Sequence, residues 1–232
     1  MIRFLLRTAR PLWRIRRFAL WTEVLFWWKW LRDRKALPVR TQLLDPQRPL
    51  GSDIVAIADR LGSDHVRILD VGAGPLTTIG HRHPTKEIEI VACDVLAPAY
   101  DRLLRKRGIT PVVPTIYADA EHLRETFEPA SFDIVVAGNC VDHMEQPLRA
   151  IEQMLDVVRP GGSVLLVHFI DEGKKQDYTG LHAWNLREEH GTLIVANEHE
   201  RIDAGVHFAG KANVTAWTNG QLVVAELRRI SA

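Results

Sequence analysis

The ten residues from Arg67 to Leu76, Arg-Ile-Leu-Asp-Val-Gly-Ala-Gly-Pro-Leu, decide the fold of this chain, because a short apolar run passes directly into a glycine-rich turn. A second apolar run begins at Ile88 and ends at Asp94, 24 positions after Asp70. This succession is typical of the first two strands of a doubly wound α/β sheet, which binds a nucleoside over the carboxyl ends of its strands. Asp94 is then placed to bind the ribose hydroxyls.

The glycine-rich turn does not suit a pyrophosphate. The dinucleotide fingerprint G-x-G-x-x-G needs a small third residue, but Thr77 stands there, and Pro75 removes one backbone amide donor. Short-chain dehydrogenases also carry a Tyr-x-x-x-Lys pair, and the positions four after the three tyrosines are Leu104, Glu121 and His182. We therefore expect a nucleoside ligand without phosphate, not a nicotinamide cofactor.

At this point the chain resembles the class I methyltransferases that depend on S-adenosyl-L-methionine (SAM). Their first motif reads acidic-x-Gly-x-Gly-x-Gly, which Asp70, Gly72 and Gly74 match, while Leu76 replaces the third glycine. Later motifs of the family resemble, in order, residues 117–123 (YADAEHL), 132–144 (FDIVVAGNCVDHM) and 158–167 (VRPGGSVLLV). Four ordered motifs make the resemblance specific, although they span less than half of the chain.

The resemblance implies a SAM cofactor and names the residues that would bind it. They are Asp70, Gly72, Ala73, Gly74 and Pro75 in the first turn, Asp94 and Val95 after the second strand, Asp119 and Ala120 near the adenine, and Asn139 near the methionine end. Plain structural roles remain open for some of them: a surface carboxylate for Asp94, a helix N-cap for Asp119 and a turn position for Asn139.

The expected architecture is α/β, a doubly wound and mostly parallel seven-stranded sheet with an antiparallel C-terminal hairpin. Asn219-Gly220 between two apolar runs is the hairpin signal. Helices are expected from Ser52, over 98–107, 121–127 and 146–158, with a short one after the glycine turn that His83-Pro84 ends, and a strand over 112–117. We divide the chain into a helical extension and linker, residues 1–50, and a methyltransferase-like domain, residues 51–232.

Three histidines are candidates for the base that a hydroxyl acceptor requires. His143 follows the fourth strand, His168 ends the fifth, and His182 lies in a long segment, residues 171–201, that we expect to be a functional loop. For His143 and His168, hydrogen bonding to backbone at strand ends is the alternative. His182 and Trp184 alternate in sequence, so both are expected to contact the methyl acceptor, with Trp184 as a flat wall.

Metal and disulfide chemistry are not expected. His81-x-His83 has a spacing that can hold zinc, but no cysteine or carboxylate stands nearby at ligand spacing. Cys93 and Cys140 are the only cysteines, both at expected strand ends, so a reducing cytoplasm is the simplest location.

The N-terminal 35 residues hold ten Lys/Arg against two acidic residues, and five of the seven tryptophans fall in the first thirty. The spacing would place five arginines on one helical face, namely Arg3, Arg7, Arg10, Arg14 and Arg17, and Pro11 indicates two helical pieces with a joint at Arg10. Glu23 and Lys29 interrupt an apolar run that is too short to cross a bilayer, and no cleavage site follows, so we expect neither a signal peptide nor a transmembrane span. Two interpretations remain: a solvated cap on the domain, or a surface for an anionic membrane or acidic partner.

The sequence thus predicts a SAM-dependent methyltransferase acting on an oxygen of a small molecule or a glycan, with a lipid-linked glycan included. We place it in the cytoplasm, with peripheral contact to the inner face of the membrane through residues 1–35. The alternative is a catalytically inactive methyltransferase-like binding subunit at a membrane surface. Nucleic acid is not an expected partner, because the basic excess is confined to one segment, and the sequence does not define an oligomeric state.

Overall fold

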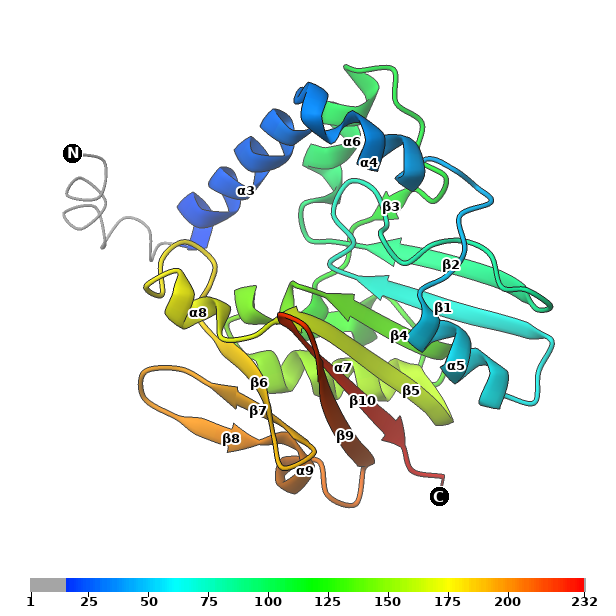
Figure 1. Ribbon diagram of the computed structural model, residues 1–232, viewed down its shortest axis with the longest axis vertical. Helices are drawn as coiled ribbons and strands as arrows, with labels where there is room; N and C mark the ends of the chain where they lie inside the picture. The colour runs from blue at the N-terminus through cyan, green and yellow to red at the C-terminus, as the bar shows by residue number, and fades with distance from the viewer. Residues whose placement is uncertain (1–15, 232) are drawn as a thin grey trace.

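The computed structural model describes residues 16–231, which form a seven-stranded sheet with helices on both faces (Figure 1). The strand order is β3-β2-β1-β4-β5-β10-β9. In chain order the strands are β1 (His65–Val71), β2 (Glu87–Cys93), β3 (Thr115–Ile116), β4 (Phe132–Gly138), β5 (Val158–Phe169), β9 (Ala212–Asn219) and β10 (Leu222–Arg229). Strands β1 to β5 are parallel, and β10 runs antiparallel to both β5 and β9. This order confirms the predicted fold class.

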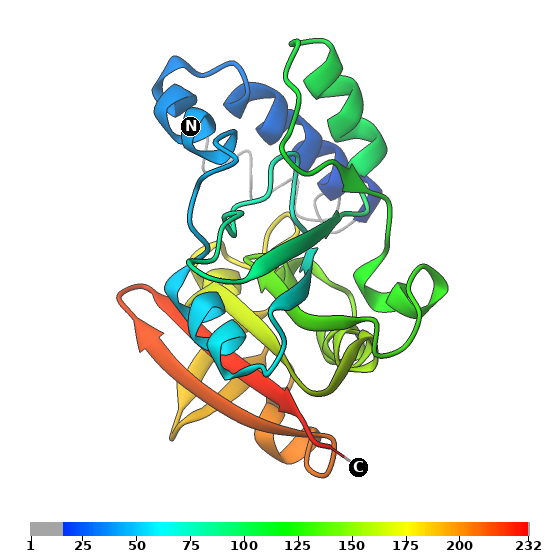
Figure 2. The ribbon, with the colours of Figure 1, turned by 90° about the vertical axis from the view of Figure 1, so that its right-hand side faces the viewer.

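Burial on both faces explains the long apolar runs of the central strands. Ile68 of β1 points to one face, where it packs with α5 (Ser52–Arg60), while Leu69 points to the other, where it packs with α7 (Pro147–Val157). Figure 2 shows α5, in cyan, lying over its face of the sheet. The predicted helices at Ser52, 98–107 and 146–158 are confirmed as α5, α6 (Ala97–Arg105) and α7.

The C-terminal hairpin is also confirmed. Asn219 pairs with Leu222 across a two-residue turn, and Gly220 takes the positive φ of 61° that such turns require. The hairpin supplies the antiparallel edge of the sheet.

No helix follows the glycine turn among the described residues, so the predicted short helix is wrong. Residues 72–86 instead form a string of turns. This string is tied to the linker that precedes α5: the His81 amide donates to the Arg48 carbonyl, and the Leu50 amide donates to the Arg82 carbonyl. Those backbone bonds take the place of a helical ladder.

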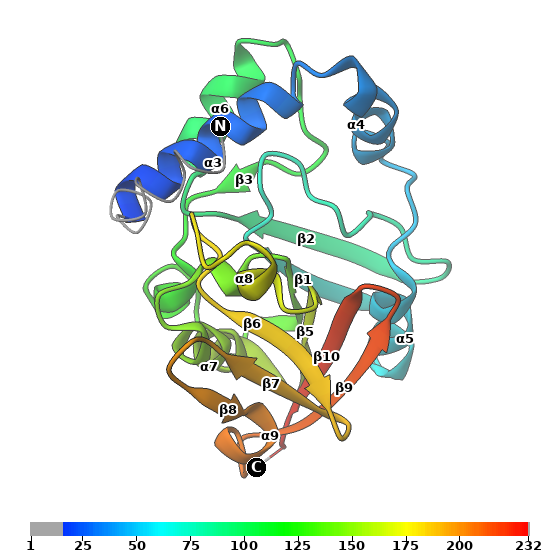
Figure 3. The same ribbon diagram turned by 60° about the vertical axis from the view of Figure 1, so that its left-hand side comes forward.

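The segment expected to be a loop at residues 171–201 contains a second sheet (Figure 3). Helix α8 (Glu172–Lys175) is followed by β6 (Asn185–Glu189), β7 (Thr192–Ala196) and β8 (Arg201–Asp203), which pair antiparallel, and then by α9 (Ala204–His207). Leu186, Leu193 and Val195 are fully buried in the same core as α7. The loop prediction is therefore wrong for most of this segment, in which residues 176–184 and 197–200 connect elements irregularly.

Two shorter predictions need correction. The strand predicted over 112–117 is reduced to the two residues of β3, and the helix predicted over 121–127 is the 3-10 helix η2 (Ala120–Glu125).

The N-terminal segment packs against the domain. Helix α3 (Arg16–Trp30) lies against α6, and the 3-10 helix η1 (Arg34–Ala36) and α4 (Leu37–Leu43) lead to α5 (Figure 1). Arg3, Arg7, Arg10, Arg14 and Pro11 lie outside the described residues, so the predicted arginine stripe is not seen. Within residues 16–231, no helix has the length and apolar character needed to cross a bilayer. The division at residue 50 stays a prediction.

Candidate active site

A cavity of about 640 Å³ opens at the carboxyl ends of β1, β2 and β4. All but one of the predicted cofactor residues line it, namely Asp70, Gly72, Ala73, Gly74, Asp94, Val95, Asp119, Ala120 and Asn139. The exception is Pro75, which is buried in the turn behind the wall. Their location agrees with a binding site, and their contacts with a cofactor stay a prediction.

The glycine turn brings backbone close to the cavity at two positions. Gly72 and Gly74 have φ of +67° and +65°, a conformation that favours glycine. A Cβ on Gly72 would lie 2.6 Å from both Cβ and Sγ of Cys140, and a Cβ on Gly74 would lie 3.0 Å from the Trp27 ring. Side chains here would push the turn away from β4 and from α3.

Asp94 ties the glycine turn to the start of α6. Its carboxylate accepts a hydrogen bond from the Gly74 amide at 3.1 Å and another from the Leu96 amide at 2.8 Å. Burial raises the pKa of Asp94, and these two hydrogen bonds only partly offset it. Each carboxylate oxygen keeps a second lone pair for a ligand.

Asp70 lies deeper and accepts a hydrogen bond from the Thr77 hydroxyl. Burial raises the pKa of Asp70 to about 7, and the nearby Asp94 carboxylate also raises it, against the Thr77 bond. Thr77, which departs from the dinucleotide fingerprint, therefore has a structural role in holding the first acidic residue of the motif.

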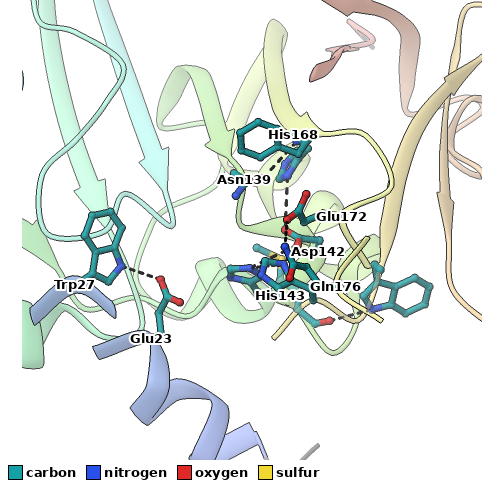
Figure 4. A network of polar contacts seen from close by, with 12 residues as sticks. Glu23, Trp27, Asn139, Asp142, His143, His168, Glu172 and Gln176 are labelled. Atoms are coloured by element: carbon teal, nitrogen blue, oxygen red, sulfur yellow. Dashed lines mark hydrogen bonds and ion pairs between the residues drawn. The ribbon is translucent and has the colours of Figure 1, made fainter. Parts of the chain in front are cut away.

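A cluster of polar side chains borders the other end of the cavity (Figure 4). Asp142 and His143 lie on η3 (Val141–His143), the turn that follows β4, and His182 comes from the connection between α8 and β6. Asp142 Oδ2 lies 2.7 Å from His182 Nδ1, which in turn lies 3.2 Å from His143 Nε2. The Ala183 amide donates to the Asp142 carbonyl and pins the connection in this place.

Burial and mutual charge set the ionisation of this cluster. Burial raises the pKa of Asp142, but the hydrogen bond from His182 and the three nearby imidazoles outweigh it and lower the pKa overall. Burial lowers the pKa of His143. Burial also opposes the charge on His182, yet the bond to Asp142 raises the pKa of His182 overall. At neutral pH Asp142 is therefore an anion beside a neutral His143.

His143 and His182 are brought together as predicted, but His168 is not at the cavity. It is only 1% exposed, its Nδ1 lies 3.9 Å from Asp142 Oδ1, and burial lowers its pKa to about 4. Contact with an acceptor is thus contradicted, because β5 turns this side chain into the interior. Sequence reasoning missed Asp142, although an acid directly before His143 was the available signal.

Trp184 does not form a wall for the acceptor. It is buried in the core, and its Nε1 donates to the Met144 carbonyl at 3.0 Å. The chain turns at residues 179–182 instead of running extended, so His182 and Trp184 do not share a face. His81 and His83 are likewise buried: His83 Nδ1 accepts backbone amides, and its Nε2 lies 3.2 Å from Asp59.

Helix α3 forms the wall of the cavity that lies beyond the carboxyl ends of the strands. Leu20, Glu23, Phe26 and Trp27 line it, and Trp27 Nε1 donates to Glu23 Oε1 at 2.8 Å (Figure 4). Burial raises the pKa of Glu23. A groove of about 240 Å³ continues between α3 and residues 179–182 and reaches His182. The sequence analysis left open whether this N-terminal segment caps the domain or contacts a membrane.

Comparisons with known proteins agree with this geometry. Residues 69–166 match the methyltransferase domain family. A ubiquinone/menaquinone biosynthesis C-methyltransferase, UbiE, of Idiomarina loihiensis is 34% identical over 110 residues, 45% of this chain and 43% of that protein. A phosphatidylethanolamine N-methyltransferase of Cereibacter sphaeroides is 34% identical over 107 residues, 44% of this chain and 51% of that protein. The chain therefore spans about half the length of these curated relatives.

Solved structures share the fold at low identity. The CurJ carbon methyltransferase superposes with a TM-score of 0.55 at 17% identity, over 77% of this chain and 52% of that one. The CMeT domain of the citrinin polyketide synthase gives 0.50 at 14% identity, over 75% and 50%. These likenesses bear on the fold alone.

Proposed function

We propose that this chain, which belongs to the class I SAM-dependent methyltransferases, transfers a methyl group to an oxygen of a small molecule or a glycan. The observation that carries this proposal is the cluster of Asp142, His143 and His182 at the cavity. SAM, when bound, supplies a methyl group already activated on a sulfonium sulfur.

The charge and shape of the cavity lining suit such a cofactor. The carboxylates of Glu23, Asp70 and Asp94 line it, so a ligand with cationic groups is favoured there over a polyanion. The glycine turn brings backbone close without the amide-rich helix start that a pyrophosphate would need.

The choice of oxygen follows from proton chemistry. An amine attacks as its neutral free base, whereas a hydroxyl must lose its proton as the methyl group arrives. The Asp142 cluster is where this chain can take up that proton or hold the negative charge left behind. Positioning of the acceptor oxygen behind the methyl group then supplies much of the rate.

Exposed aromatic side chains on α3 support an acceptor that resides in a membrane. Trp21, Phe26 and Trp28 are 56%, 53% and 39% exposed, and the guanidinium of Arg32 stacks over Trp28 at 4.5 Å. Aromatic rings with basic neighbours suit the interface of an anionic bilayer. Phe26 also borders the groove that reaches His182. We therefore propose that α3 contacts the membrane peripherally from the cytoplasmic side. We also propose that the methyl acceptor is lipid-linked.

The experiment uses SAM with a deuterated methyl group, incubated with the protein and a metabolite and lipid extract from cells that lack it. Mass spectrometry finds the labelled product, and NMR assigns the methylated atom. An O-methyl product supports the proposal, and a C-methyl or N-methyl product refutes the acceptor atom. SAM binding without any labelled product would instead favour the inactive binding subunit.

A further inference from the structure

We propose that Asp142, His143 and His182 form a binding site for one divalent transition-metal ion, which holds the acceptor oxygen as its anion. The catalytic part rests on the proposed function, whereas the metal site stands on the geometry of the cluster alone. The sequence analysis weighed only His81 and His83 as ligands and expected no metal.

The three donor atoms converge on one point. Asp142 Oδ2 and His182 Nδ1 lie 2.7 Å apart, His182 Nδ1 and His143 Nε2 lie 3.2 Å apart, and His143 Nε2 and Asp142 Oδ2 lie 3.5 Å apart. Around a tetrahedral zinc ion with bonds of about 2.0–2.2 Å, ligand atoms lie roughly 3.3–3.5 Å apart. Two edges of the triangle are close to that spacing, and only the shortest edge must open for an ion to enter. Among the described residues, this is also the one group of three such side chains with converging donor atoms.

The three contacts of this triangle cannot all be hydrogen bonds at the same time. His182 Nδ1 carries at most one hydrogen, which it can direct well at Asp142 or at His143 but not at both. The two imidazole rings meet at 73° with centroids 4.6 Å apart, so they do not stack. A cation at the centre accepts all three lone pairs at once.

Buried, unpaired polar atoms give a second indication of a ligand. Asp142 is 1% exposed, and its Oδ1 has no hydrogen-bond partner among the described residues. Burying a carboxylate is costly unless its charge is compensated. In the protein this charge is balanced by the short bond to His182 and by the nearby imidazoles, with His168 Nδ1 3.9 Å from the unbonded Oδ1. A divalent ion on the same carboxylate would add direct compensation.

The surrounding backbone holds the ligands in place. Asp142 and His143 are adjacent on η3, where the His143 amide donates to the Cys140 carbonyl. His182 is fixed from both sides, because its own amide donates to the Thr179 carbonyl and the next amide, that of Ala183, donates to Asp142. The backbone of the three ligand residues is thus held in place before an ion arrives.

The donor set selects the class of ion. Two imidazole nitrogens and one carboxylate suit zinc, iron(II), cobalt or manganese, whereas magnesium and calcium prefer oxygen ligands. Three protein ligands leave at least one position open, and the cluster borders the cavity, so that position can take the acceptor.

The step balances without an oxidant or reductant. An acceptor hydroxyl on the ion loses its proton to solvent, because a bound cation lowers the pKa of an oxygen ligand. The oxygen then forms a bond to the methyl carbon as the carbon–sulfur bond breaks, which leaves a methyl ether and a neutral thioether. The metal changes no oxidation state.

The test is titration of chelator-stripped, full-length protein with Zn²⁺ by calorimetry and with Co²⁺ by visible absorption. We expect one equivalent of each ion and a Co²⁺ spectrum of low coordination number. His143→Ala, His182→Ala and Asp142→Asn should each weaken Zn²⁺ binding by more than about 100-fold, because even partners outside the ligand shell are worth 10–100-fold.

His122→Ala is the matched control. His122 Nδ1 also lies near a carboxylate, 3.4 Å from Asp119 Oδ2, but within residues 16–231 this pair belongs to no group of three converging ligands, so Zn²⁺ binding should be unchanged. SAM titration of each variant shows that it is folded. Asp142→Asn keeps the size of the side chain and so covers the case in which an alanine variant does not fold.

Each outcome decides something. Absence of a tight Zn²⁺ equivalent, or equal affinity in the three variants and the wild type, overturns the metal site. Tight binding in the wild type alone supports it, even if no methyl transfer is found, in which case only the proposed function fails. Methyl transfer unaffected by chelator stripping refutes the catalytic role of the ion and leaves the methyltransferase proposal intact.

Discussion

At the scale of single residues, Asp70 is the acidic side chain most changed by folding. It is buried, the Thr77 hydroxyl is the one hydrogen-bond donor to its carboxylate within residues 16–231, and burial raises its pKa from an ordinary 3.8 to about 7. Because the folded state holds this proton more tightly than the unfolded state, the protonated carboxyl stabilises the fold at low pH. That stability is lost as pH rises from about 4 to about 7 and then stays constant.

Asp70→Asn should remove this pH dependence. Asparagine carries no charge and can still bond with Thr77. Between pH 5 and pH 8, the free energy of unfolding of the wild type should therefore fall by about 2–3 kcal/mol more than that of the variant. Urea unfolding of both ligand-free proteins at the two pH values measures the difference. Equal loss in variant and wild type would show that Asp70 is ionised throughout.

Asp94 should be a direct contact of the cofactor. Asp94→Ala is expected to weaken SAM binding by about 1.5–3 kcal/mol, the range for hydrogen bonds to a charged group. Because Asp94 also accepts the Gly74 and Leu96 amides, Asp94→Asn separates the two roles: its oxygen can keep one of these bonds. Calorimetry on both variants is the measurement, and unchanged SAM affinity in both would remove Asp94 from the site.

The Asp142 cluster should affect turnover more than cofactor binding. His143→Ala and His182→Ala are each expected to slow single-turnover methylation by about 10²- to 10⁴-fold, with SAM affinity nearly unchanged, since these side chains serve the acceptor. The assay requires the acceptor found by deuterium labelling. Normal turnover in both variants would leave positioning alone to explain the rate.

Residue-level prediction succeeded where chemistry is local and failed where it depends on tertiary packing. The glycine turn and Asp94 follow each other along two adjacent strands, so their meeting at one sheet edge could be predicted. The orientation of Trp184 depends on the bend at residues 179–182 and on β6, which no local pattern reveals. His143 and His182 are 39 residues apart, and they are brought together by tertiary bonds such as those from the Ala183 amide to the Asp142 carbonyl and from Trp184 Nε1 to the Met144 carbonyl.

At the scale of elements, helix α3 carries large apolar side chains on more than one side. One side packs on α6, where Trp27 meets Tyr100 edge to face at 6.2 Å, and another side exposes Trp21 and Trp28, while the exposed Phe26 borders the cavity and the groove. A helix that is apolar on both sides needs a second partner for the exposed side.

Anionic liposomes should be that partner. Replacing Trp21, Phe26 and Trp28 together by serine should strongly reduce binding of the full chain to vesicles rich in phosphatidylglycerol, and salt should weaken the wild-type binding. Trp217→Ser is the control, because Trp217 is 37% exposed, close to the 39% of Trp28, but lies on edge strand β9. Wild-type protein that ignores these vesicles at low salt would exclude the membrane proposal.

The second sheet was not predicted because its strands are short and lack the sequence patterns that mark strands and hairpins. Thr192–Ala196 is apolar on every residue after the first and is buried on both faces, so it lacks the alternation that marks a half-buried strand. His190 and Gly191 form its turn with positive φ at both positions, a hairpin geometry that His-Gly signals only weakly. By contrast, Asn219-Gly220 is a strong sequence signal and predicted the C-terminal hairpin correctly.

At the scale of the whole molecule, the N-terminal segment and the domain share one site. Trp27 lies against the glycine turn, and Glu23 borders both the cavity and the groove. The boundary at residue 50 stays a prediction, and side chains from both sides of it line the cavity.

Deletion of residues 1–35 should consequently weaken SAM binding together with liposome binding, because it removes one wall of the cavity. Trp27→Ala should weaken SAM binding while leaving liposome binding largely in place, since this ring faces the domain. Equilibrium binding of SAM to the deletion, the point variant and the wild type measures both effects. Full SAM affinity in the deletion would show that α3 is dispensable to the cavity.

The position of α3 in the chain has a consequence for how the protein is made. Trp27 leaves the ribosome well before its partner Tyr100, by roughly 4–15 s at synthesis rates of about 5–20 residues per second. During that interval a basic, tryptophan-rich segment has none of the surface it later covers. The aromatic side chains of this segment are then exposed, so lipid or another nascent chain can bind them in competition with the domain that is still being synthesised.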